Sequence, residues 1–177
     1  MKKRLILFVS MFLTCFFLNA QIKRDFDGVI LGKATKSDVK SYLAKKGYHY
    51  EIMEDGNAIQ SRNEVSFGGV LWSGVYYSFC KETLYRVTYT KIVQDKEKDL
   101  KRKYKELREN LYKKYVKRIP QDNSNDYKPE TKIKDKSTLI KLSIHRHKTR
   151  PYILYLKLTY LDLNLEKRKE QEEINDL

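Results

Sequence analysis

Cysteine is almost absent from this chain of 177 residues, which contains only Cys15 and Cys80. If the first 20 residues are removed on export, as argued below, Cys80 remains alone and an intrachain disulfide is excluded. Apolar packing must then supply the stability of the domain. Cys80 ends an apolar, aromatic stretch, so we interpret it as a small packed side chain and not as a nucleophile.

Long apolar runs are also lacking, apart from one at the beginning of the sequence. Lys2, Lys3 and Arg4 precede an apolar run over residues 5–18 that ends at Asn19-Ala20. This order is typical of a secretory signal, so we expect residues 1–20 to be a signal peptide cleaved before Gln21. The run is too short for a spanning helix, which predicts an exported protein, periplasmic or secreted, with no membrane span after cleavage. A permanent anchor and lipidation at Cys15 are the alternatives, and a poor residue context disfavours the second.

Acidic residues are scarce relative to basic ones, 23 against 37, which gives a formal net charge of +14. Most of the excess falls within residues 95–150. In an exported protein such a face points to anionic lipid, acidic polysaccharide or an acidic protein, and not to nucleic acid. The alternative is a solvated lysine-rich face without a specific partner. The candidate anionic-surface patch comprises Lys101, Arg102, Lys105, Arg108, Lys113, Lys114 and Lys117.

Motifs that carry catalysis or bind metals are missing or incomplete. His145 and His147 project to the same side of a strand, but three cations follow within the same short segment. Residues 122–126 resemble the opening of a calcium loop without its glycine and its final glutamate. Cys80 has no evident base with a third orienting group, and Gly68-Gly69 lacks the lysine of a phosphate loop. We therefore expect no enzyme activity, no cofactor and no metal.

Helical periodicity is clear in two places. Thr35 and Asp38 form a capping-box pattern before a helix over residues 36–46, which Gly47 ends. Residues 95–116 carry an apolar stripe at helical spacing with charge on every other face. The stripe consists of Leu100, Tyr104, Leu107, Leu111 and Tyr115.

Alternating apolar and polar residues predict two β-hairpins, over residues 72–92 and 138–161. A polar surface loop is expected over residues 117–137. Residues 163–177 are expected to form a charged tail, either a frayed helix or a disordered segment. We thus predict one α+β domain, residues 21–162. Its antiparallel sheet should have about five to six strands, with two helices on one face.

Aromatic residues are concentrated in residues 65–92, which hold the only tryptophan. Because both helices can cover only one face of the sheet, tyrosines of the other face are candidate contacts for a protein partner. The candidate partner-binding residues are Trp72, Tyr76, Tyr85 and Tyr155. Core filling is the alternative role for each of them.

The segment Gly32-Lys33-Ala34-Thr35-Lys36-Ser37-Asp38-Val39, followed by an aromatic strand pair, resembles one known family of small exported modules. These are the β-lactamase-inhibitor-protein-like domains and the related small outer-membrane assembly lipoprotein. The resemblance covers residues 28–92 and implies a binding module without catalysis. The sequence thus predicts a non-catalytic binding module of the cell envelope. Electrostatic association with anionic lipid or polysaccharide, and inhibition of a hydrolase, are the alternatives.

Overall fold

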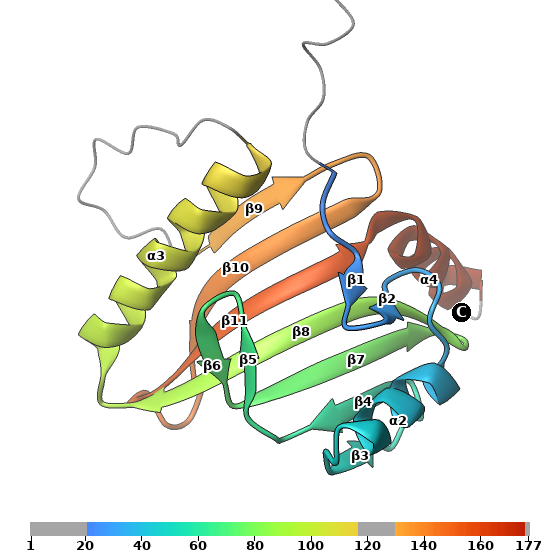
Figure 1. The fold of residues 1–177 in the computed structure, drawn as a ribbon, viewed down its shortest axis with the longest axis horizontal. Coiled ribbons are helices and arrows are strands. Elements are labelled where there is room, and N and C mark those ends of the chain that lie inside the picture. The colour runs from blue at the N-terminus through green and yellow to red at the C-terminus, as the bar shows by residue number, and fades with distance from the viewer. Residues whose placement is uncertain (1–20, 117–129, 176–177) are drawn as a thin grey trace, which may run out of the picture.

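An antiparallel sheet of seven strands forms the centre of the molecule in the computed structural model, which describes residues 21–116 and 130–175 (Figure 1). The strand order is β3-β4-β7-β8-β11-β10-β9. The strands are β3 (Tyr50–Ile52), β4 (Ala58–Ser61), β7 (Gly74–Cys80), β8 (Thr83–Gln94), β9 (Glu130–Lys134), β10 (Thr138–Arg146) and β11 (Ile153–Asp162). The α+β class and the antiparallel sheet agree with the sequence-based prediction.

Two features of the prediction are wrong. A sheet of five to six strands is too small, because β9 lies within residues 117–137, which the sequence predicted as loop. Two helices are too few, because residues 163–177 contain α4 (Leu163–Asn175). Asp162 caps this helix by accepting hydrogen bonds at 2.9 Å from the backbone N–H groups of Asn164 and Leu165.

The helices α2 (Lys36–Lys45) and α3 (Glu97–Tyr115) form where the sequence predicts them. The predicted capping box at the start of α2 is present, and its hydrogen bonds from Thr35 lower the pKa of Asp38. All five residues of the predicted apolar stripe of α3 are buried. Both helices therefore contribute their apolar faces to the core.

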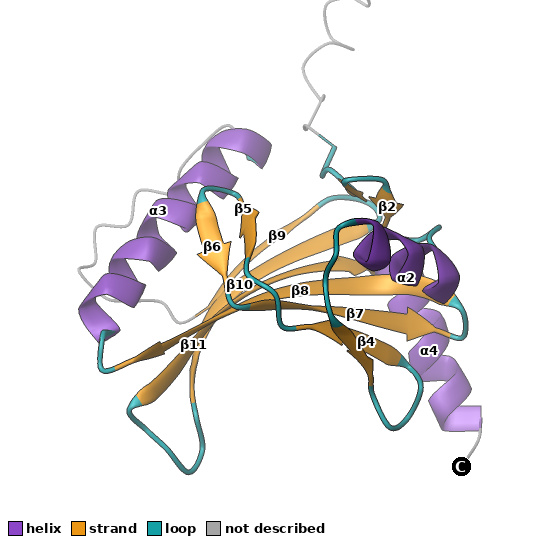
Figure 2. Cartoon of the chain, turned by 60° about the horizontal axis from the view of Figure 1, so that its bottom comes forward, coloured by secondary structure: helices purple, strands orange, loops and turns teal. Residues whose placement is uncertain are grey.

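The two sides of the sheet are covered very differently (Figure 2). One side carries α2, α3 and two small hairpins, β1–β2 (Asp25–Phe26, Val29–Ile30) and β5–β6 (Val65–Phe67, Val70–Trp72). Of the elements that the structure describes, only α4 lies on the other side, near one end of the strands. Leu163 and Leu165 of α4 pack there against a small cluster of Cys80, Tyr85 and Leu161. The described part of the chain leaves most of this second side open.

The core lies between the sheet and the covering elements, and aromatic rings dominate one part of it. The rings of Phe67 and Tyr89 are stacked with centroids 4.4 Å apart, and Phe26 meets Tyr160 edge to face at 5.0 Å. Trp72 is fully buried and donates a hydrogen bond of 2.8 Å from Nε1 to the carbonyl of Phe67. The tryptophan thus belongs to the β5–β6 hairpin over the core and not to the β7–β8 hairpin.

Candidate functional site

Side-chain alternation along the long strands creates the open face, defined here as the sheet surface that points away from α2 and α3. In β8, Val87 and Tyr89 enter the core, whereas Arg86, Thr88 and Thr90 point to the opposite side. Neighbouring strands follow the same rule. They add Gln60, Tyr76, Ser78, Tyr155, Lys157 and Thr159 to the open face.

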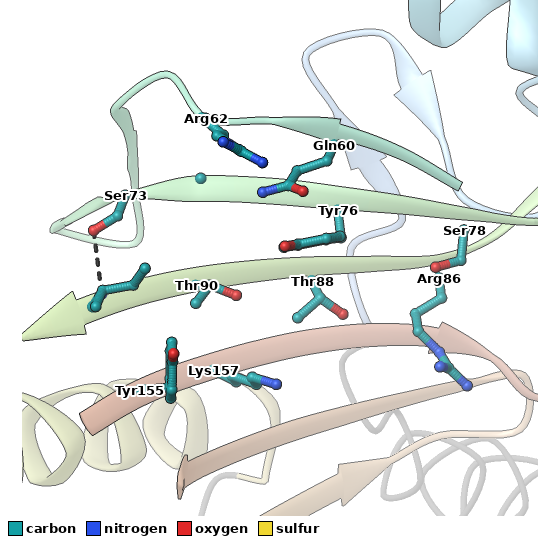
Figure 3. A pocket seen from close by; sticks show the side chains of 12 residues that line it. Gln60, Arg62, Ser73, Tyr76, Ser78, Arg86, Thr88, Thr90, Tyr155 and Lys157 are labelled. Atoms are coloured by element: carbon teal, nitrogen blue, oxygen red, sulfur yellow. Dashed lines mark hydrogen bonds between the residues drawn. The ribbon is translucent and has the colours of Figure 1, made fainter. Parts of the chain in front are cut away.

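Two shallow hollows mark the open face, with volumes of about 620 Å³ and 400 Å³. The larger lies over β4, β7, β8 and β11, with Tyr76 and Tyr155 among its lining residues (Figure 3). The smaller lies over β8, β11, β10 and β9. Arg86, Thr88 and Lys157 line both, so the two hollows adjoin at these three residues. Each volume by itself is within the range of ordinary ligand sites.

Positive charge predominates on the open face. Among the described residues that line the hollows, Glu166 of α4 is the only acid. The basic residues that line them are Arg62, Arg86, Lys132, Lys141 and Lys157. In such a field an anionic group is attracted and a cationic group is repelled.

Some of these cations already have carboxylate partners. Lys132 and Lys141 contact Glu130 at 2.7 and 2.6 Å, and their hydrogen bonds lower the pKa of Glu130 to about 2. Arg86 is 3.4 Å from Glu166, which is long for a charge-assisted hydrogen bond. No ion pair of Lys157 occurs among the described residues, and its ammonium lies 5.9 Å from the ring centre of Tyr155.

Two buried polar atoms on the open face have no hydrogen-bond partner within the described part of the chain, Arg86 Nε and Thr90 Oγ1. Thr90 is only 7% exposed. Buried polar groups are nearly always paired in native proteins, because an unpaired one loses its hydration without compensation. Both atoms belong to residues that line the larger hollow.

The candidate partner-binding residues separate into two groups. Tyr76 and Tyr155 are half-buried and line the larger hollow together. Trp72 is fully buried in the core, and Tyr85 is 3% exposed beneath α4, where the Arg86 guanidinium lies 5.0 Å from its ring centre. A buried ring presents no surface to a partner, so only Tyr76 and Tyr155 enter our proposal.

The candidate anionic-surface patch lies on α3, on the covered side of the sheet. Lys101 pairs with Glu97 and Arg102 with Asp99, at 2.8 and 3.3 Å. Arg108 and Lys114 lie over neighbouring tyrosine rings, with 5.6 and 5.2 Å between the charged group and the ring centre. Lys105 and Lys113 are exposed. Lys117 lies outside the described residues.

A serine and a histidine that the sequence analysis did not connect lie together on β10. Ser143 Oγ and His145 Nε2 share a hydrogen bond of 2.8 Å. Burial and the nearby cations Lys157 and Lys141 lower the pKa of His145, so the imidazole is neutral near pH 7. Ser143, however, is only 3% exposed, and its backbone is paired on both sides, with β9 and β11. Backbone N–H groups that are used in a sheet cannot form an oxyanion hole, so this pair does not constitute an acyl-transfer site.

The other candidate chemical groups are dispersed. His147 Nδ1 accepts hydrogen bonds from the backbone N–H groups of Thr149 and Arg150 at 3.3 and 3.2 Å, which orients its ring within the loop. Cys80 is a buried free thiol. No group of three His, Cys, Asp or Glu side chains placed to hold a metal ion occurs within residues 21–116 and 130–175. The calcium-like segment 122–126 lies outside these residues.

The fold and the open face together define an α+β domain with one side of its antiparallel sheet covered and the other largely accessible. Comparisons with protein-family models, with curated proteins and with solved structures gave no match. None of the described helices is long and apolar enough to cross a membrane. The predicted signal peptide, residues 1–20, lies outside the described residues.

Proposed function

We propose that this chain is an exported, non-catalytic binding module of the cell envelope that holds a protein partner on its open face. The observation that carries the proposal is the larger hollow with Tyr76 and Tyr155 in its lining. Tyrosine provides large contact area at low entropic cost together with a polar tip, and it is enriched at protein interfaces. Here two half-buried rings lie on strands β7 and β11, which flank β8, so the sheet holds them in fixed positions.

Rigid placement favours binding because little conformational entropy is lost when the partner arrives. The central strands β7, β8 and β11 are paired on both sides, and β8 pairs with β11 over nine residues. Two of the lining hydroxyls are also held in place, since Thr88 and Thr159 share a hydrogen bond of 3.1 Å. The resemblance to β-lactamase-inhibitor-protein-like modules, and inhibition of a hydrolase as the specific role, stay predictions.

Either Tyr76→Ala or Tyr155→Ala is expected to weaken capture of the partner roughly tenfold, as for the aromatic anchors of other interfaces. The mature chain is immobilised, exposed to envelope extract of the producing organism, and washed with salt at about 0.5 M, which screens exposed charges. Tyr50→Ala on the edge strand β3 is the matched control, because Tyr50 is exposed and lies outside both hollows. Equal capture by all three variants contradicts the proposal.

A second candidate function is electrostatic association of α3 with anionic lipid or polysaccharide. Lys105 and Lys113 favour it, because both are exposed and no ion pair of either occurs in the described chain. The salt wash separates the two functions. Retention on anionic vesicles that disappears at about 0.5 M salt, and that Lys105→Gln with Lys113→Gln abolishes, supports the second function. Retention that requires Tyr76 and is unchanged by Lys105→Gln with Lys113→Gln supports the first.

A further inference from the structure

The two hollows meet at Arg86, Thr88 and Lys157. Two cations and a hydroxyl are typical of an anion-binding site, and the described chain supplies too few carboxylates to neutralise the cations. The guanidinium of Arg86 and the ammonium of Lys157 project from the neighbouring strands β8 and β11. Glu166, at 3.4 Å from Arg86, is the only acid that lines either hollow among the described residues. One weakly engaged carboxylate does not balance two cations.

Two unpaired buried atoms in residues that line the larger hollow are a second observation, independent of the charge. Arg86 Nε and Thr90 Oγ1 are buried without a partner in the described chain, and Thr90 is more than nine-tenths buried and lines the larger hollow. Arg86 Nε can only donate a hydrogen bond, whereas Thr90 Oγ1 can donate or accept. A carboxylate oxygen is the kind of acceptor that the first atom lacks, whereas the second lacks either an acceptor or an N–H donor.

The contact with Glu166 shows that the Arg86 guanidinium binds a carboxylate. Glu166 belongs to α4, so a carboxylate from a separate segment of chain already approaches Arg86 across the open face. A longer acidic segment along the open face would pass Lys157 and reach the tyrosines, since Tyr155 lies two residues from Lys157 on the same face of β11. Charge complementarity and the adjacent rings both favour a peptide over a bare anion.

We propose that the open face binds an acidic peptide segment, whose carboxylates are held by Arg86 and Lys157 where the two hollows meet. The proposal rests on the proposed function and specifies the chemistry of the partner. The partner presents Asp or Glu side chains in an extended stretch, and its apolar parts lie on Tyr76 and Tyr155.

The probe for this proposal is a fluorescein-labelled peptide of ten glutamates, and binding is measured by fluorescence anisotropy with the full mature chain. Arg86→Gln combined with Lys157→Gln is expected to weaken binding about tenfold or more, as for charge pairs at interfaces. The control is Lys105→Gln combined with Lys113→Gln on α3, which removes the same charge from the opposite side of the molecule. It is expected to change affinity less than about twofold. Circular dichroism melting verifies that both variants are folded.

A variant that is expected to bind more tightly provides a further test, because misfolding would weaken binding and not strengthen it. Glu166→Gln removes the competing carboxylate from Arg86 and is expected to tighten binding of the glutamate peptide about two- to threefold. Unchanged or weaker binding by Glu166→Gln contradicts a site at Arg86. Equal losses of affinity in the open-face and α3 double variants would show that net charge alone attracts the peptide, and would overturn the proposal. Absence of binding by the wild type would overturn it as well.

Dextran sulfate distinguishes a polysaccharide from a peptide. If it binds more tightly than the glutamate peptide and depends equally on Arg86 and Lys157, the ligand is a sulfated polymer and the peptide proposal is overturned. If the glutamate peptide fails but capture from envelope extract still depends on Tyr76, only the assigned chemistry is wrong and the binding function stands. If that capture is independent of Tyr76 as well, the proposed function also fails.

Discussion

Replacing Arg24 by Ala is expected to lower the free energy of unfolding by about 3 kcal/mol, because it leaves a buried carboxylate without its partner. The guanidinium of Arg24 forms an ion pair with Asp162, which is only 4% exposed. It also donates hydrogen bonds to the carbonyl of Leu31 at 2.9 Å and to Ser137 Oγ at 3.1 Å. Gly32 has a positive φ of 81°, and a Cβ there would collide with both members of the pair. Arg24 therefore connects the first hairpin to the end of β11.

Urea denaturation followed by circular dichroism measures this loss, with Lys23→Ala as the control. Lys23 is the adjacent cation and is exposed, so its removal is expected to change the free energy of unfolding by less than about 0.5 kcal/mol. A loss of less than about 1 kcal/mol for Arg24→Ala would place the pair among surface ion pairs and contradict this account of the first hairpin.

Replacing Trp72 by Ala is expected to cost about 3–5 kcal/mol of stability, the usual range for deleting a buried large aromatic side chain. Trp72 is fully buried, lies 5.8 Å from the ring centre of Tyr89, and its Nε1–H donates to the carbonyl of Phe67. Removing the indole therefore leaves a cavity and removes the hydrogen bond to the Phe67 carbonyl.

The milder change Trp72→Phe separates packing from partner binding. It keeps an aromatic ring and is expected to reduce stability while leaving capture of the partner on the open face unchanged. Thermal unfolding and the capture assay on the same preparation provide the two readings. A folded Trp72→Phe variant that fails to capture the partner would show that Trp72 contributes to the interface, contrary to its position in the core.

The sequence predicted those elements whose signal is local. The capping box of α2 and the apolar stripe of α3 each depend on residues three or four positions apart, and both helices form as expected. By contrast, α4 buries no residue fully and has a weak apolar face of Leu163 and Leu165. The clearest local feature that predicts this helix is the N-cap Asp162. Asp162 is also the last residue of β11, so the sequence alone does not identify it as a cap. Tertiary packing against the sheet completes this helix.

The candidate site was predictable in outline but not in its members. Alternation places Tyr76 and Tyr85 on neighbouring strands of the predicted hairpin, yet it does not reveal that α4 covers the end where Tyr85 lies. Trp72 shares the aromatic stretch but turns into the core, because β6 leaves the main sheet to form a separate hairpin with β5. Arg86 and Lys157 line the same hollows only because β8 pairs with β11, and these strands are 71 residues apart at Thr88 and Thr159. Such long-range pairing leaves no local pattern.

The most direct test of the open face as the binding surface is photo-crosslinking in producing cells, with benzoylphenylalanine in place of Tyr76. Position 76 projects into the larger hollow, whereas Lys105 on the exposed side of α3 provides the matched control position. We predict one discrete adduct from position 76, lost when Arg86 and Lys157 are both changed to Gln, and none of the same mass from position 105. Adducts from position 105 alone, or the same adduct from both positions, would contradict the account.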